Sequence, residues 1–278
     1  MKELRGAVAV ITGAASGIGR ALATELASAG AQLALADVSA AGLEETRRLL
    51  GSATARTYTV DVGDPAAVEA FAAKVGEDFG RVSLLINNAG VALHGTFAEV
   101  SLKDMEWLLR INYWGVIYGC KLFMPLLQRE PEAHIVNVSS VFGLIGPPGQ
   151  TAYASSKFAV RGFTEALRYE LKDTNIRVSC VHPGGISTAI ADNARLGEKA
   201  NAQEAAKLKA RFKKITPTTP EEAARVIVKG ILNNKPRILI GSDARRIDAI
   251  QRLVPIRGVS ALVSMMAKRA PGGAKKPS

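Results

Sequence analysis

The stretch AVAVITGAASGIG, residues 7–19, joins a short apolar run to a glycine-rich turn, and it decides the fold class. Its first part, Ala7–Thr12, has the length and composition of a buried strand. Small residues then allow a tight turn into a helix predicted over Ile18–Ser28, whose N-terminus could hold a pyrophosphate. The glycine spacing is wider than G-x-G-x-x-G, and a packed turn without a ligand is the alternative interpretation.

Strand-like apolar runs and helical patterns alternate along the rest of the chain. Further strands are predicted at Gln32–Ala36, Arg56–Val60, Val82–Ile86, His134–Val138, Arg177–Val181 and Arg237–Ile240. Further helices are predicted at Ala40–Leu50, Pro65–Phe79, Ser101–Gln128, Tyr153–Leu171 and Pro220–Leu232. Because the strands are near-continuous runs of Val, Ile, Leu and Ala, the pattern predicts one α/β domain over residues 1–242, a doubly wound, mostly parallel sheet with helices on both faces.

Tyr153 and Lys157 lie four residues apart, so they share one face of the predicted helix. A neighbouring ammonium favours the phenolate, and Lys157 is therefore expected to lower the tyrosine pKa from its ordinary value of ~10. Such a tyrosine can exchange a proton with an alcohol or a carbonyl oxygen. Taken alone, this spacing is more often a solvated helix surface, so the neighbouring motifs must decide.

Asp37 closes the second predicted strand, 18 residues after Gly19. An acid there can accept hydrogen bonds from a ribose 2′-hydroxyl and repels a 2′-phosphate. Val38 and Ala15 supply no cation for such a phosphate, so the sequence favours NAD, with NADP less expected. An N-cap for the following helix is the alternative role of Asp37, and the two roles can coexist.

Taken in order, the motifs resemble the short-chain dehydrogenase/reductase family, in its single-domain branch. They are Thr12-Gly13-x-x-x-Gly17-Ile18-Gly19, Asp61-Val62, Asn87-Asn88-Ala89-Gly90, Asn112, Ser140, Tyr153-x-x-x-Lys157 and Pro183-Gly184. The 13-residue separation of Ser140 and Tyr153 also matches the family. The resemblance implies a seven-stranded sheet in the order 3-2-1-4-5-6-7 and hydride transfer between an alcohol carbon and nicotinamide, without a metal.

The resemblance also implies a role for each matching residue. Tyr153 would be the general acid/base, Lys157 would lower its pKa and bind the nicotinamide ribose, and Ser140 would orient the substrate oxygen. Asn112 would position a water in a proton relay from Lys157. The cofactor-binding residues would be Gly13, Ser16, Gly17, Ile18, Gly19, Asp37, Asp61, Val62, Asn88, Ala89, Gly90, Tyr153, Lys157, Pro183, Gly184, Ile186 and Thr188.

Plainer structural interpretations stay open for Ser139, Ser140, Asn87, Asn88, Asn112, His94 and His182. Either serine could cap a loop, and Ser139 could be the functional one, although the spacing favours Ser140. The paired asparagines could form a turn, and Asn112 could be a satisfied buried amide. Both histidines are interpreted as structural, and the three histidines and two cysteines lack metal-ligand spacing.

The residues expected near the substrate are Val91, Leu93, Val141, Phe142, Leu144, Ile145 and Gln150, most of them apolar, together with Ser140 and Tyr153. They predict a hydrophobic secondary alcohol or ketone as the substrate, because no arginine is placed to hold a carboxylate. Residues 188–216 resemble a polar, lysine-rich helical insertion that would form a lid. The apolar helices at 101–128 and 153–171 predict a homodimer or a homotetramer.

Charge is unevenly distributed along the 278 residues, of which 47% are hydrophobic. Residues 1–194 carry 17 basic and 19 acidic side chains, whereas residues 243–278 carry eight and two. A near-neutral body argues against nucleic-acid binding. No apolar run reaches the ~18 residues of a membrane span. Cys120 and Cys180 fall inside a predicted helix and a predicted strand, which indicates a reducing, cytoplasmic location without a disulfide.

Residues 243–278 form a basic tail in which Ile247, Ile250, Leu253 and Val254 recur at helical spacing. Packing on a partner subunit or over the pocket is the favoured interpretation, and peripheral contact with an anionic membrane is the alternative. Residues 271–278 are expected to be disordered. A catalytically idle nucleotide-binding scaffold is the remaining alternative to an enzyme.

Overall fold

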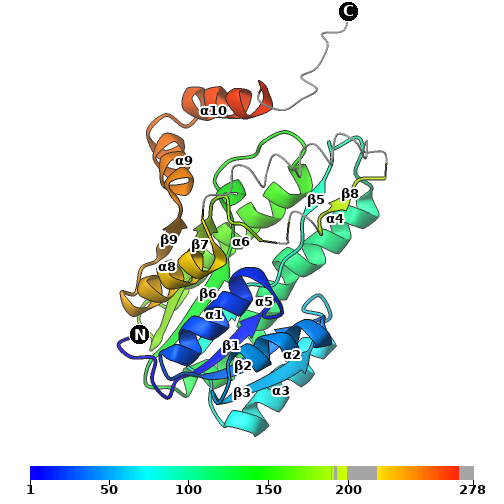
Figure 1. Ribbon diagram of the computed structural model, residues 1–278. Coiled ribbons are helices and arrows are strands. Elements are labelled where there is room, and N and C mark those ends of the chain that lie inside the picture. Colours follow the sequence, from blue (N-terminus) through cyan, green and yellow to red (C-terminus); the bar gives the residue numbers. More distant parts are fainter. Residues whose placement is uncertain (189, 191–192, 199–217, 269–278) are drawn as a thin grey trace, which may run out of the picture.

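Seven parallel strands form the central sheet of the computed structural model, which describes residues 1–188, 190, 193–198 and 218–268 (Figure 1). They are β1 Val8–Thr12, β2 Gln32–Asp37, β3 Ala55–Thr59, β4 Leu84–Asn87, β6 Ala133–Val138, β7 Ile176–Pro183 and β9 Arg237–Ile240. Their spatial order is β3-β2-β1-β4-β6-β7-β9. Counted within this sheet alone, the order is 3-2-1-4-5-6-7, so the predicted fold class is confirmed.

Helices cover both faces of the sheet (Figure 1). On one face lie α1 Gly17–Ser28, α2 Ala40–Leu49 and α8 Pro220–Leu232, and on the other lie α3 Pro65–Phe79, α5 Gly115–Gln128 and α6 Thr151–Glu170. β1 supplies both cores, since Ala9 and Ile11 pack on the first face and Val8 and Val10 on the second. This alternation explains why the strand is apolar from Val8 to Ile11.

Helix starts follow local capping chemistry. Asp64 accepts a hydrogen bond from the N–H of Ala66, and Pro65 occupies the first position of α3, as predicted. The start of α2 corrects one alternative interpretation, because its N-cap is Ser39, whose hydroxyl accepts from the N–H of Gly42. Asp37 therefore does not cap this helix.

The prediction of one continuous α-helix over Ser101–Gln128 is wrong, because a π-helical turn interrupts it. The structure has α4 Leu102–Leu109, a π-helical turn η1 at Arg110–Trp114, and then α5. Asn112 lies at the centre of η1, and its amide binds both backbone groups of Val91. A π turn adds one residue to a turn of the helix, and the sequence pattern does not mark where this extra residue falls.

Short elements border the carboxyl ends of the strands. β5 Leu93–His94 pairs in parallel with β8 Arg195–Leu196, and a 3₁₀ turn η2 at Val141–Gly143 follows β6. β8 falls within the predicted lid, but 189, 191–192 and 199–217 lie outside the described residues, as do 271–278. Among the helices that are described, none is both long and apolar enough to cross a membrane.

The tail forms two helices, α9 Ser242–Leu253 and α10 Arg257–Lys268, above the carboxyl end of the sheet (Figure 1). Ala244 and Ile247 of α9 are buried against Val141, Leu144 and Ile145, around η2. Val259 and Leu262 of α10 pack against the same cluster. An ion-pair chain adds to this contact, since Arg237 of β9 bonds both Asp248 of α9 and Glu165 of α6.

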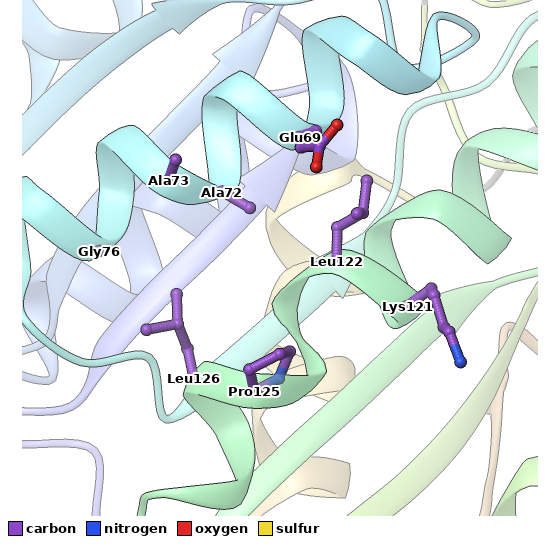
Figure 2. A pocket seen from close by; sticks show the side chains of 8 residues that line it. All are labelled: Glu69, Ala72, Ala73, Gly76, Lys121, Leu122, Pro125 and Leu126. Atoms are coloured by element: carbon purple, nitrogen blue, oxygen red, sulfur yellow. The ribbon is translucent and has the colours of Figure 1, made fainter.

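A surface hollow between α3 and α5 is lined by Glu69, Ala72, Ala73, Gly76, Lys121, Leu122, Pro125 and Leu126 (Figure 2). It contains none of the predicted site residues, which lie at the carboxyl ends of the strands.

Candidate active site

Two loops at the carboxyl edge of the sheet are joined through Thr12 and Asn88. The Thr12 hydroxyl accepts hydrogen bonds from the N–H groups of Asn88 and Ala89, each at 3.0 Å. The Asn88 amide donates to the carbonyls of Thr12 at 3.0 Å and of Gly13 at 3.2 Å. The glycine turn after β1 and the loop after β4 are therefore fixed against each other, and Asn88 is more than a turn former.

The glycine turn has the geometry of an anion site. Gly13 and Gly17 have positive φ values of 68° and 52°, and a Cβ on Gly19 would overlap the Gly13 carbonyl. Ser16 is the N-cap of α1, but its side chain makes no capping hydrogen bond, and the first turn of α1 holds no acid. Backbone N–H groups at this helix end thus remain suited to an anionic ligand.

Asp37 at the end of β2 supports the same turn. Its Oδ2 accepts from the N–H of Ala15 at 3.1 Å, and its Oδ1 accepts from the N–H of Ser39 at 3.0 Å. Each carboxylate oxygen has further capacity to accept a hydrogen bond. Arg20, the nearby cation that donates to the Ala15 carbonyl, is paired with Glu45 at 2.7 Å.

Ser140 and Tyr153 meet where β6 ends and α6 begins. The Ser140 hydroxyl accepts from the N–H of Phe142 at 3.1 Å, and the Phe142 ring packs edge-on against Tyr153 at 6.2 Å between centroids. Ser139 points elsewhere, since its hydroxyl donates to the Lys157 carbonyl at 2.8 Å. Ser140 is therefore the serine beside the phenol.

Lys157 is 3% exposed, and its Nζ donates to the Val138 carbonyl at 3.0 Å. This Nζ lies 5.8 Å from the centre of the Tyr153 ring. Burial lowers the pKa of Lys157 to about 8. The group nevertheless stays mainly protonated at neutral pH.

The tyrosine pKa differs from the prediction. Burial raises the pKa of Tyr153, and the hydrogen bond with Ser140 opposes that rise only in part. The prediction that Lys157 lowers the pKa of Tyr153 is thus wrong for the protein without a bound cofactor. The helical spacing correctly placed the lysine beside the ring, but it could not reveal the cost of burying a phenolate.

At the carboxyl edge of the sheet, the backbone of Gly90 lies close to the side chains of Asn112 and Lys157. A Cβ on Gly90 would lie 3.2 Å from Asn112 Oδ1 and 3.5 Å from Lys157 Nζ. The Asn112 side chain accepts from the N–H of Val91 at 2.8 Å and donates to the Val91 carbonyl at 3.0 Å and to Ser156 Oγ at 3.2 Å. These contacts match the alternative interpretation, a satisfied buried amide that braces a loop.

The other predicted cofactor residues lie on flanking loops. Asp61 accepts from the N–H of Gly63 at 2.8 Å and pairs with Arg110 at 3.4 Å, and Val62 is buried. Thr188 approaches the glycine turn, since its Cγ2 lies 3.2 Å from the position of a Cβ on Gly17. The loop after β7 therefore borders the turn after β1.

The residues predicted to contact the substrate do not all lie around one site. Phe142 is half-buried beside Tyr153, but Leu144 is buried in the cluster beneath α9 and α10. The Gln150 side chain is hydrogen-bonded to His94 Nδ1. His182 binds the Ser140 carbonyl at 3.0 Å, and burial lowers its pKa to about 4, which leaves it neutral.

Sequence reasoning missed Asp243, in the first turn of α9. Its Oδ2 accepts from the N–H of Gly185 at 2.7 Å, and a Cβ on Gly184 would overlap this carboxylate. Asp243 therefore holds the loop that includes Pro183 and Gly184. An acid at the start of a helical pattern was the available signal, but the apolar and basic pattern of the tail does not show which loop this acid meets.

The sequence profile described as short chain dehydrogenase matches residues 7–199, which include the glycine turn, Ser140, Tyr153 and Lys157. The chain belongs to this family. The SadH protein of Mycobacterium tuberculosis, named as an oxidoreductase, is 43% identical over 258 residues, covering 91% of this chain and 93% of that protein. Mouse estradiol 17-beta-dehydrogenase 11 is 33% identical over 268 residues, covering 94% of this chain and 84% of that protein.

Among solved structures, a short-chain dehydrogenase/reductase from Burkholderia phymatum in complex with NAD is similar over the full length of both chains. The TM-score is 0.83 and the sequence identity is 32%. Family membership makes the protein an oxidoreductase of the class that uses NAD or NADP with small-molecule substrates.

The buried Lys157 of this short-chain dehydrogenase predicts how stability changes at alkaline pH. Below pH 8 both states bind the proton, and the native state bears the full cost of burying the charge. Between pH 8 and 10.5 the native state releases the proton first, so the contribution of Lys157 to the free energy of unfolding rises with pH, by about 3 kcal/mol at most. Lys157→Met should lack this rise. Denaturant unfolding of both proteins across the window measures it, and parallel pH curves would contradict the expected burial cost.

Asp243 and Gly184 should behave as a coupled pair in this member of the family. Gly184→Ala alone should cost about 1–3 kcal/mol, because the new methyl group meets the carboxylate. In the Asp243→Ala background the same change should cost at least about 1 kcal/mol less. Gly146→Ala is the control, since a Cβ there meets nothing within 4 Å. Additive losses in the double-mutant cycle would show that the two residues do not interact.

Proposed function

We propose that the protein is an NAD-dependent oxidoreductase that interconverts a hydrophobic secondary alcohol and its ketone by hydride transfer. The observation that carries the proposal is the group formed by Ser140, Tyr153 and the buried Lys157, beside the uncapped start of α1. A proton-transfer group and an anion-binding helix end lie at the same edge of the sheet, where ligands of open α/β folds bind.

The glycine turn fits the cofactor. Its close backbone approach and the free N–H groups of α1 suit a pyrophosphate, and the remaining acceptor capacity of Asp37 suits a ribose hydroxyl. The negative charge of Asp37 disfavours a 2′-phosphate, and Arg20 is already paired with Glu45. These features support NAD over NADP. When bound, NAD would accept hydride from the alcohol carbon.

Proton transfer falls to Tyr153. Because the tyrosine pKa is raised, the phenol holds its proton at neutral pH and can donate it to a ketone oxygen as negative charge develops there. The Ser140 hydroxyl stabilises the same oxygen through a hydrogen bond. In the alcohol-to-ketone direction Tyr153 must first release its own proton to solvent, and the phenolate, stabilised by the Lys157 ammonium, then receives the hydroxyl proton.

The apolar surroundings support a hydrophobic substrate. Phe142 packs against Tyr153, and the turn after Ser140 is covered by apolar side chains of α9 and α10. The name of the mouse relative, an estradiol dehydrogenase, also indicates a lipophilic alcohol for that protein. Both observations favour a hydroxyl group on an apolar skeleton as the reacting class.

A cytoplasmic homodimer or homotetramer completes the proposal. Trp114 of η1 is 47% exposed, and Phe158 of α6 is 41% exposed. Aromatic rings exposed on neighbouring helices favour an interface with a second copy. Cys120 and Cys180 are both free and buried, which suits a reducing compartment.

Tyr153→Phe should lower turnover by about 100-fold or more, because it removes the hydroxyl group that carries the transferable proton and keeps the ring. Tyr169→Phe is a matched control, since Tyr169 is exposed on the same helix α6. NADH formation at a fixed alcohol concentration measures turnover, and fluorescence titration checks that NADH still binds. Near-normal turnover in Tyr153→Phe would refute the proposed acid/base.

Lipophilic secondary alcohols should react with a higher kcat/KM than short hydroxy acids, because the described residues around Tyr153 include no arginine placed to bind a carboxylate. A screen of both substrate classes, run with NAD and with NADP, measures this preference. A preference for the acids would contradict the substrate class while leaving the hydride-transfer reaction intact.

A further inference from the structure

The corner between α9 and α10 presents an apolar surface to solvent. Leu253 and Ile256 are each 80% exposed, more than any other large apolar side chain among the described residues. Val254 beside them and Met265 further along α10 add exposed apolar area. Burial of these side chains would be favourable, so the surface is suited to a partner.

The exposed charge around this corner is basic. Arg245, Arg246 and Arg257 are exposed, and within the described part of the chain no hydrogen bond or ion pair engages them. The two acids of the tail point inward instead, since Asp243 binds Gly185 and Asp248 binds Arg237. Helical spacing places Arg246 and Leu253 on one face of α9. The apolar and basic side chains therefore share the outer surface.

We propose that this tail surface, formed by Leu253, Val254, Ile256, Met265, Arg245, Arg246 and Arg257, docks on an anionic lipid bilayer. The arginines would interact with acidic headgroups, and the apolar corner would enter the boundary between headgroups and acyl chains. This interaction goes beyond the proposed reaction and does not depend on it.

Charge decides between a bilayer and a second copy of the chain. In a two-fold symmetric contact the same patch meets itself, so both halves of the interface would carry the unpaired arginines and neither would supply an unpaired acid. Such a contact is disfavoured by like-charge repulsion. An anionic surface satisfies the arginines, and a bilayer also accommodates Leu253 and Ile256, which a nucleic-acid backbone would leave exposed.

The opposite side of the same helices gives the docking a consequence for catalysis. Ala244, Ile247, Val259 and Leu262 pack on the cluster around η2, directly after Ser140. The helices that would contact the lipid thus form part of the wall near the proposed substrate site. A lipophilic alcohol could reach this site from the membrane surface.

Co-sedimentation of the full chain with vesicles tests the proposal without substrate or cofactor. We expect binding to mixed phosphatidylcholine–phosphatidylglycerol vesicles, weak binding to phosphatidylcholine alone, and loss of binding at high salt. Arg245→Gln with Arg246→Gln should weaken binding about 25-fold, about fivefold for each arginine. Leu253→Asn with Ile256→Asn should weaken binding about tenfold or more.

Leu102→Asn is the matched control, because Leu102 is 74% exposed on α4, outside the tail surface. This variant should bind like the unaltered chain, and circular dichroism verifies that every variant is folded. Equal binding to both vesicle types, or unchanged binding of the tail variants, would overturn the proposal. It would also be overturned if the tail variants dissociated an oligomer in size-exclusion chromatography without losing vesicle binding, since the surface would then be a subunit contact.

Discussion

The hydrogen bond from Lys157 Nζ to the Val138 carbonyl is the contact on which the active-site arrangement depends. It joins α6 to the end of β6 and holds a cation inside the protein. Gly90 and Asn112 enclose the same amino group, and the Ser139 hydroxyl anchors the Lys157 backbone. The cost is desolvation, which lowers the lysine pKa to about 8. Burial of this positive charge therefore lowers the stability of the protein, at a place where the proposed reaction uses the charge.

The neighbouring phenol shows why geometry and electrostatics must be considered together. Tyr153 and Lys157 occupy the helix face that their spacing requires, but burial acts on both groups and disfavours the charged form of each. Tyr153 therefore stays protonated in the protein without a bound cofactor and can act as an acid. Its hydrogen bond with Ser140 partly compensates, which makes Ser140 a partner of the phenol as well as of the proposed substrate oxygen.

The sheet could be predicted because central strands such as β1 and β4 are largely apolar on both faces, and because several helix starts carry recognisable capping chemistry, as at Asp64 and Pro65. Ser140, Tyr153, Lys157 and the glycine turn were brought together where the motifs implied. The π turn at Asn112 escaped prediction, since it follows from a tertiary contact with Val91. The raised tyrosine pKa and the role of Asp243 escaped for the same reason, because both depend on residues distant in sequence.

The attachment of α9 links the length of the chain to the integrity of the site. Asp243 holds Gly185, while Asp248 shares Arg237 with Glu165 of α6. A protease that cut between β9 and α9 would remove both carboxylates in one event. The Gly185 N–H would lose its acceptor and Arg237 would keep only Glu165, so the loop after β7 and the last strand would be left without their ties to the tail at the same moment.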